Sequence, residues 1–161
     1  MFLSYYDILI RIGLTLLFVI VLGSERERRH KAAGITTHSL VGLSTCALGI
    51  LQVELFESAL KLALDNPGLT VSIEGQRLIA QVITGIGFLG GGAILKTQNR
   101  IQGLTTAATL WGAGVLGIIF GLGYIELGAI FGVTMLLVIY INKTVLYRRN
   151  LKNSSSEKIE P

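Results

Sequence analysis

Charged residues are scarce in this chain of 161 residues, and cysteine is scarcer still. Only 15% of the residues are charged while 51% are hydrophobic, and the mean hydropathy is +0.64. A soluble domain of this size carries more polar surface, so this composition excludes one and indicates a membrane protein. The single cysteine, Cys46, excludes an internal disulfide. Because it lies inside an apolar run, we expect it to be a small packing residue.

The same scarcity argues against catalysis. Two histidines and one cysteine are too few for a nucleophile, a base and a metal at helical spacing, so we expect no enzyme, no cofactor and no metal site. A path for Mg²⁺ would want several oxygen ligands, and no ladder of acidic residues crosses the apolar runs. The net charge of +4 comes from cations beside apolar segments. Anionic lipid of the bilayer is therefore the expected counterpart, and not nucleic acid.

Five apolar runs are long enough to cross a bilayer, which takes about 17 to 25 residues. They are Tyr5–Gly23, His38–Phe56, Leu78–Leu95, Leu104–Leu122 and Tyr124–Ile141. The sequence therefore predicts an all-α membrane domain of five transmembrane helices over residues 1–147. The polar tail over residues 148–161 cannot bury enough apolar area to order itself, so we expect it to be disordered. Residues 57–76, with Asn66-Pro67-Gly68, predict an outer loop with a turn.

Lysine and arginine predict the orientation of these spans. Cations that follow the first, third and fifth runs are Arg26, Arg28, Arg29, Lys31, Lys96, Arg100, Lys143, Arg148, Arg149, Lys152 and Lys158. The opposite side holds only Lys61 and Arg77. The N-terminus is therefore predicted outside and the C-terminus inside. Residues 1–10 carry no cation, and no small-residue cleavage pattern follows, so we expect the first span to stay in the mature protein.

A short sequence similarity at an offset of 69 residues relates the first two spans to the next two. Gly34–Thr37 reads Gly-Ile-Thr-Thr and Gly103–Thr106 reads Gly-Leu-Thr-Thr, while Gly23 matches Gly92. This similarity indicates either a parallel duplication of a helical hairpin or independent use of Gly and Thr at helix starts. In both cases a threonine hydroxyl can cap the first amides of spans two and four. Those helix N-termini are also candidate anion sites, with plain capping as the alternative.

Glycines at four-residue spacing predict close packing among the last three spans. The pairs are Gly87/Gly91, Gly117/Gly121 and Gly128/Gly132. Residues 85–90 also spell the dinucleotide-binding pattern, which works only between a strand and a helix, whereas here it lies inside an apolar run. We therefore assign a packing role to Gly85, Gly87, Gly90, Gly91, Gly117 and Gly121. The alternative is that residues 85–92 unwind locally and expose carbonyls to a cavity.

Four charged residues fall inside or near the ends of the spans. Asp7 and Arg11 are four residues apart and can pair on one helix face. Glu54 and Glu126 lie near the outer ends of their spans, where either could meet Arg11. Snorkelling at the membrane rim also accounts for all four without a function.

Four sequence blocks identify a family. They cover residues 23–27, 33–38, 80–92 and 103–111, and through them the chain resembles the MgtC/SapB family of bacterial inner-membrane proteins over residues 9–140. Thr36 stands where many members have arginine, and residues 74–77 replace an acidic-Pro-x-Arg lead. Longer, virulence-associated members carry a soluble C-terminal domain similar to ACT domains, and we expect this chain to be a short form without it.

The resemblance implies a non-enzymatic regulator of other membrane proteins. Members are associated with magnesium limitation, acid adaptation and survival in host cells, and with restraint of ATP synthase through its membrane sector. Glycine faces also allow a homo-oligomer. The alternative is a magnesium or proton transporter or channel whose path is lined by the third span.

The candidate functional residues lie at the cytoplasmic ends of the spans. The first cluster follows span one, and the others match the family blocks: Glu25, Arg26, Glu27, His38, Thr105, Thr106 and Trp111. The first cluster could serve only as an orientation signal. Arginine and lysine would suffice for that, so the two interleaved glutamates favour an ordered ionic cluster.

Overall fold

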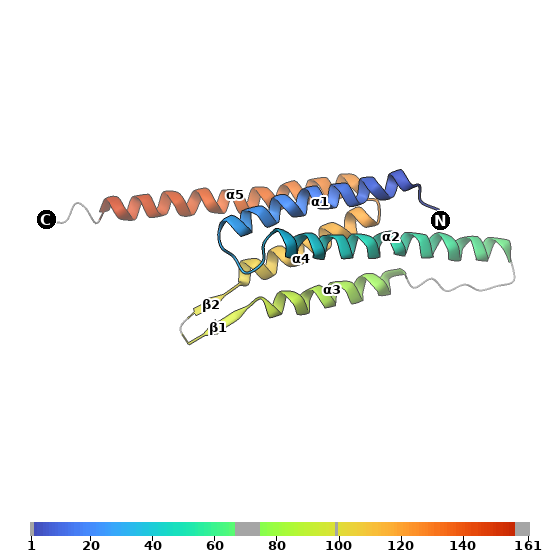
Figure 1. Cartoon of the computed structure of the whole chain (residues 1–161), viewed down its shortest axis with the longest axis horizontal. Coiled ribbons are helices and arrows are strands. Elements are labelled where there is room, and N and C mark those ends of the chain that lie inside the picture. Colours follow the sequence, from blue (N-terminus) through green and yellow to red (C-terminus); the bar gives the residue numbers. More distant parts are fainter. Residues whose placement is uncertain (1, 67–74, 99, 157–161) are drawn as a thin grey trace.

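The computed structural model describes residues 2–66, 75–98 and 100–156 as a bundle of long helices (Figure 1). In chain order the elements are α1 (Tyr5–Arg28), α2 (Ile35–Asp65), α3 (Gly75–Gly92), β1 (Leu95–Thr97), β2 (Arg100–Gln102), α4 (Leu104–Gly121) and α5 (Ile125–Ser156). The end of α1, the start of α2, the two strands and the start of α4 lie at the same end of the bundle (Figure 1). The cations after the first and third apolar runs are therefore gathered at one end.

The described helices have the composition of a membrane protein. By length and apolarity, α1, α2 and α4 can each cross a bilayer, and residues 77–92 and 125–141 form shorter apolar helices. Helices suit this environment because they satisfy every backbone hydrogen bond internally. The prediction of an all-α membrane protein is confirmed at this level. The number of spans and their orientation stay predictions.

Several helix ends differ from the apolar runs. Helix α1 continues past Gly23 to Arg28, because the glutamates and arginines that follow are good helix formers. Helix α2 continues past Phe56 to Asp65, so the first half of the predicted outer loop is helical. The predicted turn at 66–68 falls mostly outside the described residues. Helix α5 runs to Ser156 and thus into the tail predicted to be disordered, of which 157–161 lie outside the description.

A two-stranded antiparallel sheet begins at Leu95, the last residue of the third predicted span. Helix α3 ends at Gly92, and Leu95 pairs with Gln102 while Thr97 pairs with Arg100. This corrects the assignment of Leu78–Leu95 to one helix. Gly103 follows β2 with a φ of 89°, a left-handed conformation that glycine adopts at no steric cost. The chain turns there from the strand into α4.

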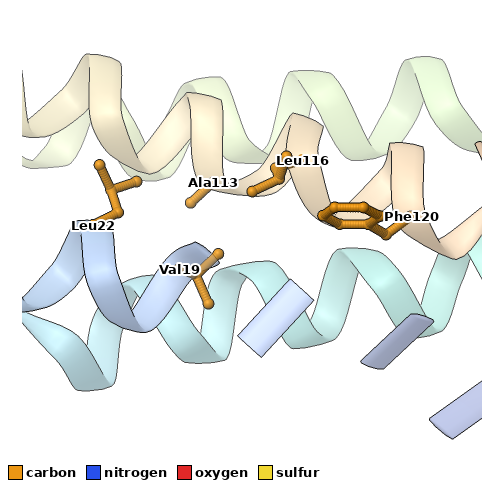
Figure 2. Packing of buried hydrophobic residues seen from close by; sticks show 5 residues of the cluster. All are labelled: Val19, Leu22, Ala113, Leu116 and Phe120. Carbon is orange, nitrogen blue, oxygen red and sulfur yellow. The ribbon is translucent and has the colours of Figure 1, made fainter. Parts of the chain in front are cut away.

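Helix α4 is the central element of the bundle. Its core contacts with α1 involve Ala113, Leu116 and Phe120 of α4 and Val19 and Leu22 of α1 (Figure 2). The rings of Phe18 and Phe120 lie 5.8 Å apart between centroids, within the range of favourable aromatic pairs. Helix α5 completes this core. Its Gly128 and Gly132 lie against the Phe120 and Phe18 rings and leave no space for a Cβ.

Helices α2 and α4 share the most extensive interface, and it is made of backbone contacts. A Cβ at Gly117 would collide with the Gly42 carbonyl and the Thr45 hydroxyl, and one at Gly121 would collide with the Cys46 carbonyl. Small residues allow two helix backbones to approach this closely. Cys46 itself is fully buried and unpaired, in agreement with a packing role.

Candidate functional site at the shared end of α1, α2 and α4

The first candidate cluster lies on the last turn of α1 and not in a loop. Glu25 Oε2 accepts a hydrogen bond from Arg26 Nε at 2.6 Å, and Arg29 Nε lies 2.5 Å from Glu25 Oε1. The second contact is ionic only, because Oε1 has no hydrogen-bond partner among the described residues. Arg26 is only 4% exposed. Glu25, Arg26 and Arg29 therefore form an ordered ionic cluster in which Arg26 is buried, while the Glu25 and Arg29 side chains keep 25% and 32% of their surface exposed.

Glu27 has a different role from its neighbours. Its Oε2 accepts a hydrogen bond of 2.9 Å from the backbone amide of Ile35, the first residue of α2. The N-cap residue of α2 is Gly34, which has no side chain to cap the helix. A carboxylate at a helix N-terminus satisfies a free amide and interacts favourably with the helix dipole. This corrects the prediction of a threonine cap at α2, because the cap comes from the preceding helix.

The turn between α1 and α2 places His30 and Lys31 next to this cap. The amides of His30 and Lys31 bond the carbonyls of Glu27 and Arg26 at 2.9 and 3.1 Å, which is the pattern of a Schellman motif. His30 occupies the left-handed position of that motif with a φ of 51°. Glycine usually stands there, so the backbone at His30 is strained.

His38 joins α2 to α4. It is fully buried, with Nδ1 2.8 Å from the Gly34 carbonyl and Nε2 3.1 Å from the Thr109 hydroxyl. In a neutral ring, Nδ1–H donates to the carbonyl and Nε2 accepts the hydroxyl proton. If the hydroxyl instead donates to the Thr106 carbonyl at 3.0 Å, Nε2 must donate as well, and the ring carries both protons. The pair therefore has one arrangement for each protonation state.

A polar cavity of about 450 Å³ lies beside these residues. It is bounded by the α1–α2 turn, the two strands and the start of α4, and its polar lining comes from His30, Lys31, Gln102, Thr105 and Thr106. Helix α4 starts after Gly103, which supplies no side-chain cap. The prediction of a threonine cap is therefore wrong at α4 too. Thr105 and Thr106 both line this cavity, and their functional role stays a prediction.

Trp111 lies apart from the other candidates. It follows Thr109 by two residues, and so projects from nearly the opposite side of α4, where it is 43% exposed. The structure gives it no contact with the ionic cluster or the cavity within the described residues.

The predicted packing glycines divide into two groups. Gly90 approaches Ala107 of α4, while Gly117 and Gly121 pack on α2. Gly85, Gly87 and Gly91 have open space within 4 Å of a built Cβ. This corrects the prediction that Gly87/Gly91 packs against the fourth and fifth spans. Residues 85–92 are helical, so the locally unwound alternative is not what the structure adopts.

At the other end of the bundle, the charged side chains of Arg11 and Glu54 form hydrogen bonds with backbone groups. Arg11 donates from Nη1 to the Gly121 carbonyl at 2.6 Å, so it satisfies the C-terminal end of α4. Glu54 accepts from the amides of Phe2 and Leu3 at 2.7 to 3.0 Å. The predicted meeting of Glu54 with Arg11 is therefore replaced by two separate backbone contacts.

Sequence reasoning missed Thr109 and treated Lys31 only as an orientation signal. Thr109 could have been found, because it lies in the same sequence block as Thr105 and on the helix turn that follows. Lys31 gave no such signal. Lys31 lies at the cavity because the backbone at His30 is left-handed. A histidine at that position does not indicate a left-handed conformation in the sequence.

Comparison with known proteins matches this architecture to one family. The MgtC family profile covers residues 12–148. This chain belongs to the MgtC family. YhiD of Escherichia coli (strain K12), which is provisionally named a magnesium transporter, is 38% identical over 147 residues, covering 91% of this chain and 66% of YhiD. Among solved structures, none matches this chain significantly.

Two further relatives are of interest. SapB of Bacillus subtilis (strain 168) is 38% identical over 131 residues, covering 77% of this chain and 53% of SapB. MgtC of Salmonella typhimurium (strain LT2) is 38% identical over 103 residues, covering 64% of this chain and 38% of MgtC. The chain thus spans about half the length of SapB and less of MgtC, so the activities of the whole relatives are not carried over by the match.

Proposed function

We propose that this chain is a multi-pass protein of the bacterial inner membrane that regulates another membrane protein and is not an enzyme. In this proposal all five helices cross the bilayer, with the N-terminus outside and the C-terminus inside. The gathering of cations at one end of the bundle supports that orientation. Helix α3 has 18 residues, about 27 Å of helix, close to the roughly 30 Å of the hydrocarbon core.

The observation that carries the regulator proposal is the outer face of α3. Gly87 and Gly91 are exposed and have open space around them, and Phe88 between them is 87% exposed. Large apolar side chains facing lipid need no explanation, but glycines at four-residue spacing gain nothing from lipid. They permit close approach of a helix from another protein. Helix α3 is therefore the proposed docking face.

The proposed target and condition are those that the resemblance to the MgtC/SapB family implies. We propose that the docked partner is the membrane sector of ATP synthase or a transporter, and that the interaction serves adaptation to low magnesium, acid or host stress. The Glu25–Arg26 pair lies at the end of α1 and is therefore not part of the docking face on α3.

The test is quantitative co-purification from native membranes after mild cross-linking. Wild type is compared with Gly87→Leu and Gly91→Leu, each inserted at equal levels. Gly13→Leu is the matched control, since Gly13 of α1 is also exposed with open space around it. We expect one membrane protein to be enriched with wild type and with Gly13→Leu, and lost with both α3 variants.

Two results would contradict the proposal. Retention of the same partner by both α3 variants would exclude the α3 face. If wild type and all variants recover only this chain, the proposal of a regulator is wrong and a homo-oligomer takes its place.

The name of YhiD favours a second candidate, a magnesium or proton transporter. Its test is flux into proteoliposomes with indicators for Mg²⁺ and for pH. The backbone-tight α2–α4 interface leads us to expect flux equal to that of empty vesicles. Flux above that level that is abolished by Gly87→Leu would establish the transporter and a path along α3.

A further inference from the structure

The polar cavity beside α4 has the composition of an anion site. It lies where the α1–α2 turn, the two strands and the start of α4 converge, and its volume of about 450 Å³ is within the usual range of small-ligand sites. Lys31 and His30 line one side, and the first turn of α4 lines the other. A cation and a helix N-terminus thus face the same space.

The N-terminus of α4 lacks an internal cap. The first bond of the helix ladder runs from the Ala107 amide to the Gly103 carbonyl at 2.8 Å, so the amides of the first turn have no intrahelical acceptor. Gly103 cannot be replaced by a capping residue. Its φ is 89°, and a Cβ there would collide with the Ala93 carbonyl.

The corresponding end of α2 is capped by the chain itself. There the Glu27 carboxylate bonds the Ile35 amide at 2.9 Å. At the 69-residue offset that relates Gly34 to Gly103, the residue corresponding to Glu27 is Lys96. The second helix start therefore has an ammonium group nearby in sequence in place of the carboxylate that would neutralise it.

A buried hydroxyl in the cavity supplies an independent observation. Thr106 lines the cavity and is only 2% exposed as a residue. Within the described residues its hydroxyl makes no hydrogen bond, and its oxygen is not among the fully buried unpartnered atoms, which are Glu25 Oε1 and Ser39 Oγ. Buried threonines elsewhere in the bundle donate to carbonyls of their own helix, as Thr15 and Thr45 do. The Thr106 hydroxyl is therefore available to donate a hydrogen bond within the cavity. An oxygen ligand in the cavity would satisfy it.

We propose that this cavity binds a phosphate group, held by the first amides of α4, the Thr106 hydroxyl and the Lys31 ammonium. Backbone amides at a helix N-terminus are a common phosphate ligand, and the lysine adds an opposite charge. The group belongs either to free phosphate or to the headgroup of an anionic phospholipid. Exposed Leu95, Ile101 and Leu104 at the same cavity would contact the acyl chains in the second case. This site is independent of the docking face on α3.

The experiment measures thermal unfolding of the purified full chain. In neutral detergent, sodium phosphate is titrated against sodium chloride at matched ionic strength. In nanodiscs, phosphatidylcholine is compared with phosphatidylcholine containing phosphatidylglycerol. We expect a saturable rise in Tm in at least one arm. A rise with phosphate assigns the free anion, and a rise only with phosphatidylglycerol assigns the lipid headgroup.

Variants at the cavity decide whether the stabilisation arises there. Thr106→Val and Lys31→Gln should each weaken apparent affinity by about tenfold or more, the usual loss for a hydrogen bond or charge that contacts an anion. Thr106→Ser, which keeps the hydroxyl, should respond like wild type. Lys61→Gln, at an exposed position on the far part of α2, is the matched charge control.

Two outcomes would overturn the site. The first is an equal response of wild type, Thr106→Val and Lys31→Gln. The second is no rise in Tm above the chloride and phosphatidylcholine controls. Neither outcome affects the co-purification test of the α3 face, which measures a different surface.

Discussion

The carboxylate of Glu27 accepts a hydrogen bond from the backbone amide of Ile35, and so the last turn of α1 caps the first turn of α2. This contact explains why an acidic residue lies among the arginines that end α1. It also explains Gly34, because a Cβ there would collide with the same carboxylate. Glu27 on α1 and Gly34 before α2 therefore both permit the close contact between the two helices at this turn.

Removing this cap should weaken the corner without changing insertion. We expect Glu27→Ala to lower the free energy of unfolding by about 1 kcal/mol, the usual loss for a helix N-cap. Thermal or denaturant unfolding in detergent, followed by circular dichroism, measures the change. Glu57→Ala, in the C-terminal third of α2, is the control. An equal loss in both variants would mean that the cap contributes nothing specific.

The His38–Thr109 contact should be sensitive to the hydroxyl and not to side-chain volume. Thr109→Val leaves the buried Nε2 of His38 without its partner, and we expect a loss of about 1 to 3 kcal/mol. Thr109→Ser keeps the hydroxyl and should be affected far less. If the two variants unfold at the same temperature, the hydrogen bond to the imidazole has no measurable effect on stability.

Two glycine pairs with the same spacing should respond in opposite ways to alanine. Gly117→Ala forces a methyl into the α2–α4 interface and should destabilise the fold by about 1 to 3 kcal/mol, as overpacking does. Gly87→Ala meets open space and should stabilise the isolated chain by about 0.5 to 1 kcal/mol through helix propensity. The free energies of unfolding of both variants, measured under the same conditions, test whether the Gly87 face of α3 is unpacked. Destabilisation by Gly87→Ala would mean that this face is packed after all.

Strain at His30 should be measurable. His30→Gly relieves a left-handed conformation and should raise the free energy of unfolding by about 1 kcal/mol. Ala32→Gly, in the same turn, should not stabilise, because it only adds freedom to the unfolded chain. The phosphate response of His30→Gly, measured as above, reports whether the imidazole also contributes to the cavity. Equal stability of wild type and His30→Gly would show that the turn carries no strain.

The sequence predicted some elements closely and missed others for identifiable reasons. The bounds of α4 were predicted as Leu104–Leu122 and observed as Leu104–Gly121, because a glycine precedes a run that is apolar on all sides. The end of α1 was missed because glutamate and arginine leave the apolar run without leaving the helix. The strands β1 and β2 are three residues each, too short to show an alternating pattern.

The candidate site divides in the same way. Glu25, Arg26 and Thr106 were identified from composition and family blocks, since charges and hydroxyls at the ends of apolar runs are visible in one dimension. Thr109 was missed as a partner of His38, because the two residues are 71 positions apart. Their contact depends on how α2 crosses α4.

The sequence by itself determined that this is a helical membrane protein of the MgtC family, with its cations gathered where the apolar runs end. Those properties follow from composition and from the order of residues along the chain. Only the tertiary structure decided which glycines are packed and which are open, because Gly87/Gly91 and Gly117/Gly121 have the same spacing. It also decided that the start of α2 is capped by Glu27 while the start of α4 opens on a polar cavity. Whether a glycine is packed or a helix start is capped depends on which helix faces lie against each other. The order of residues along the chain does not specify those contacts.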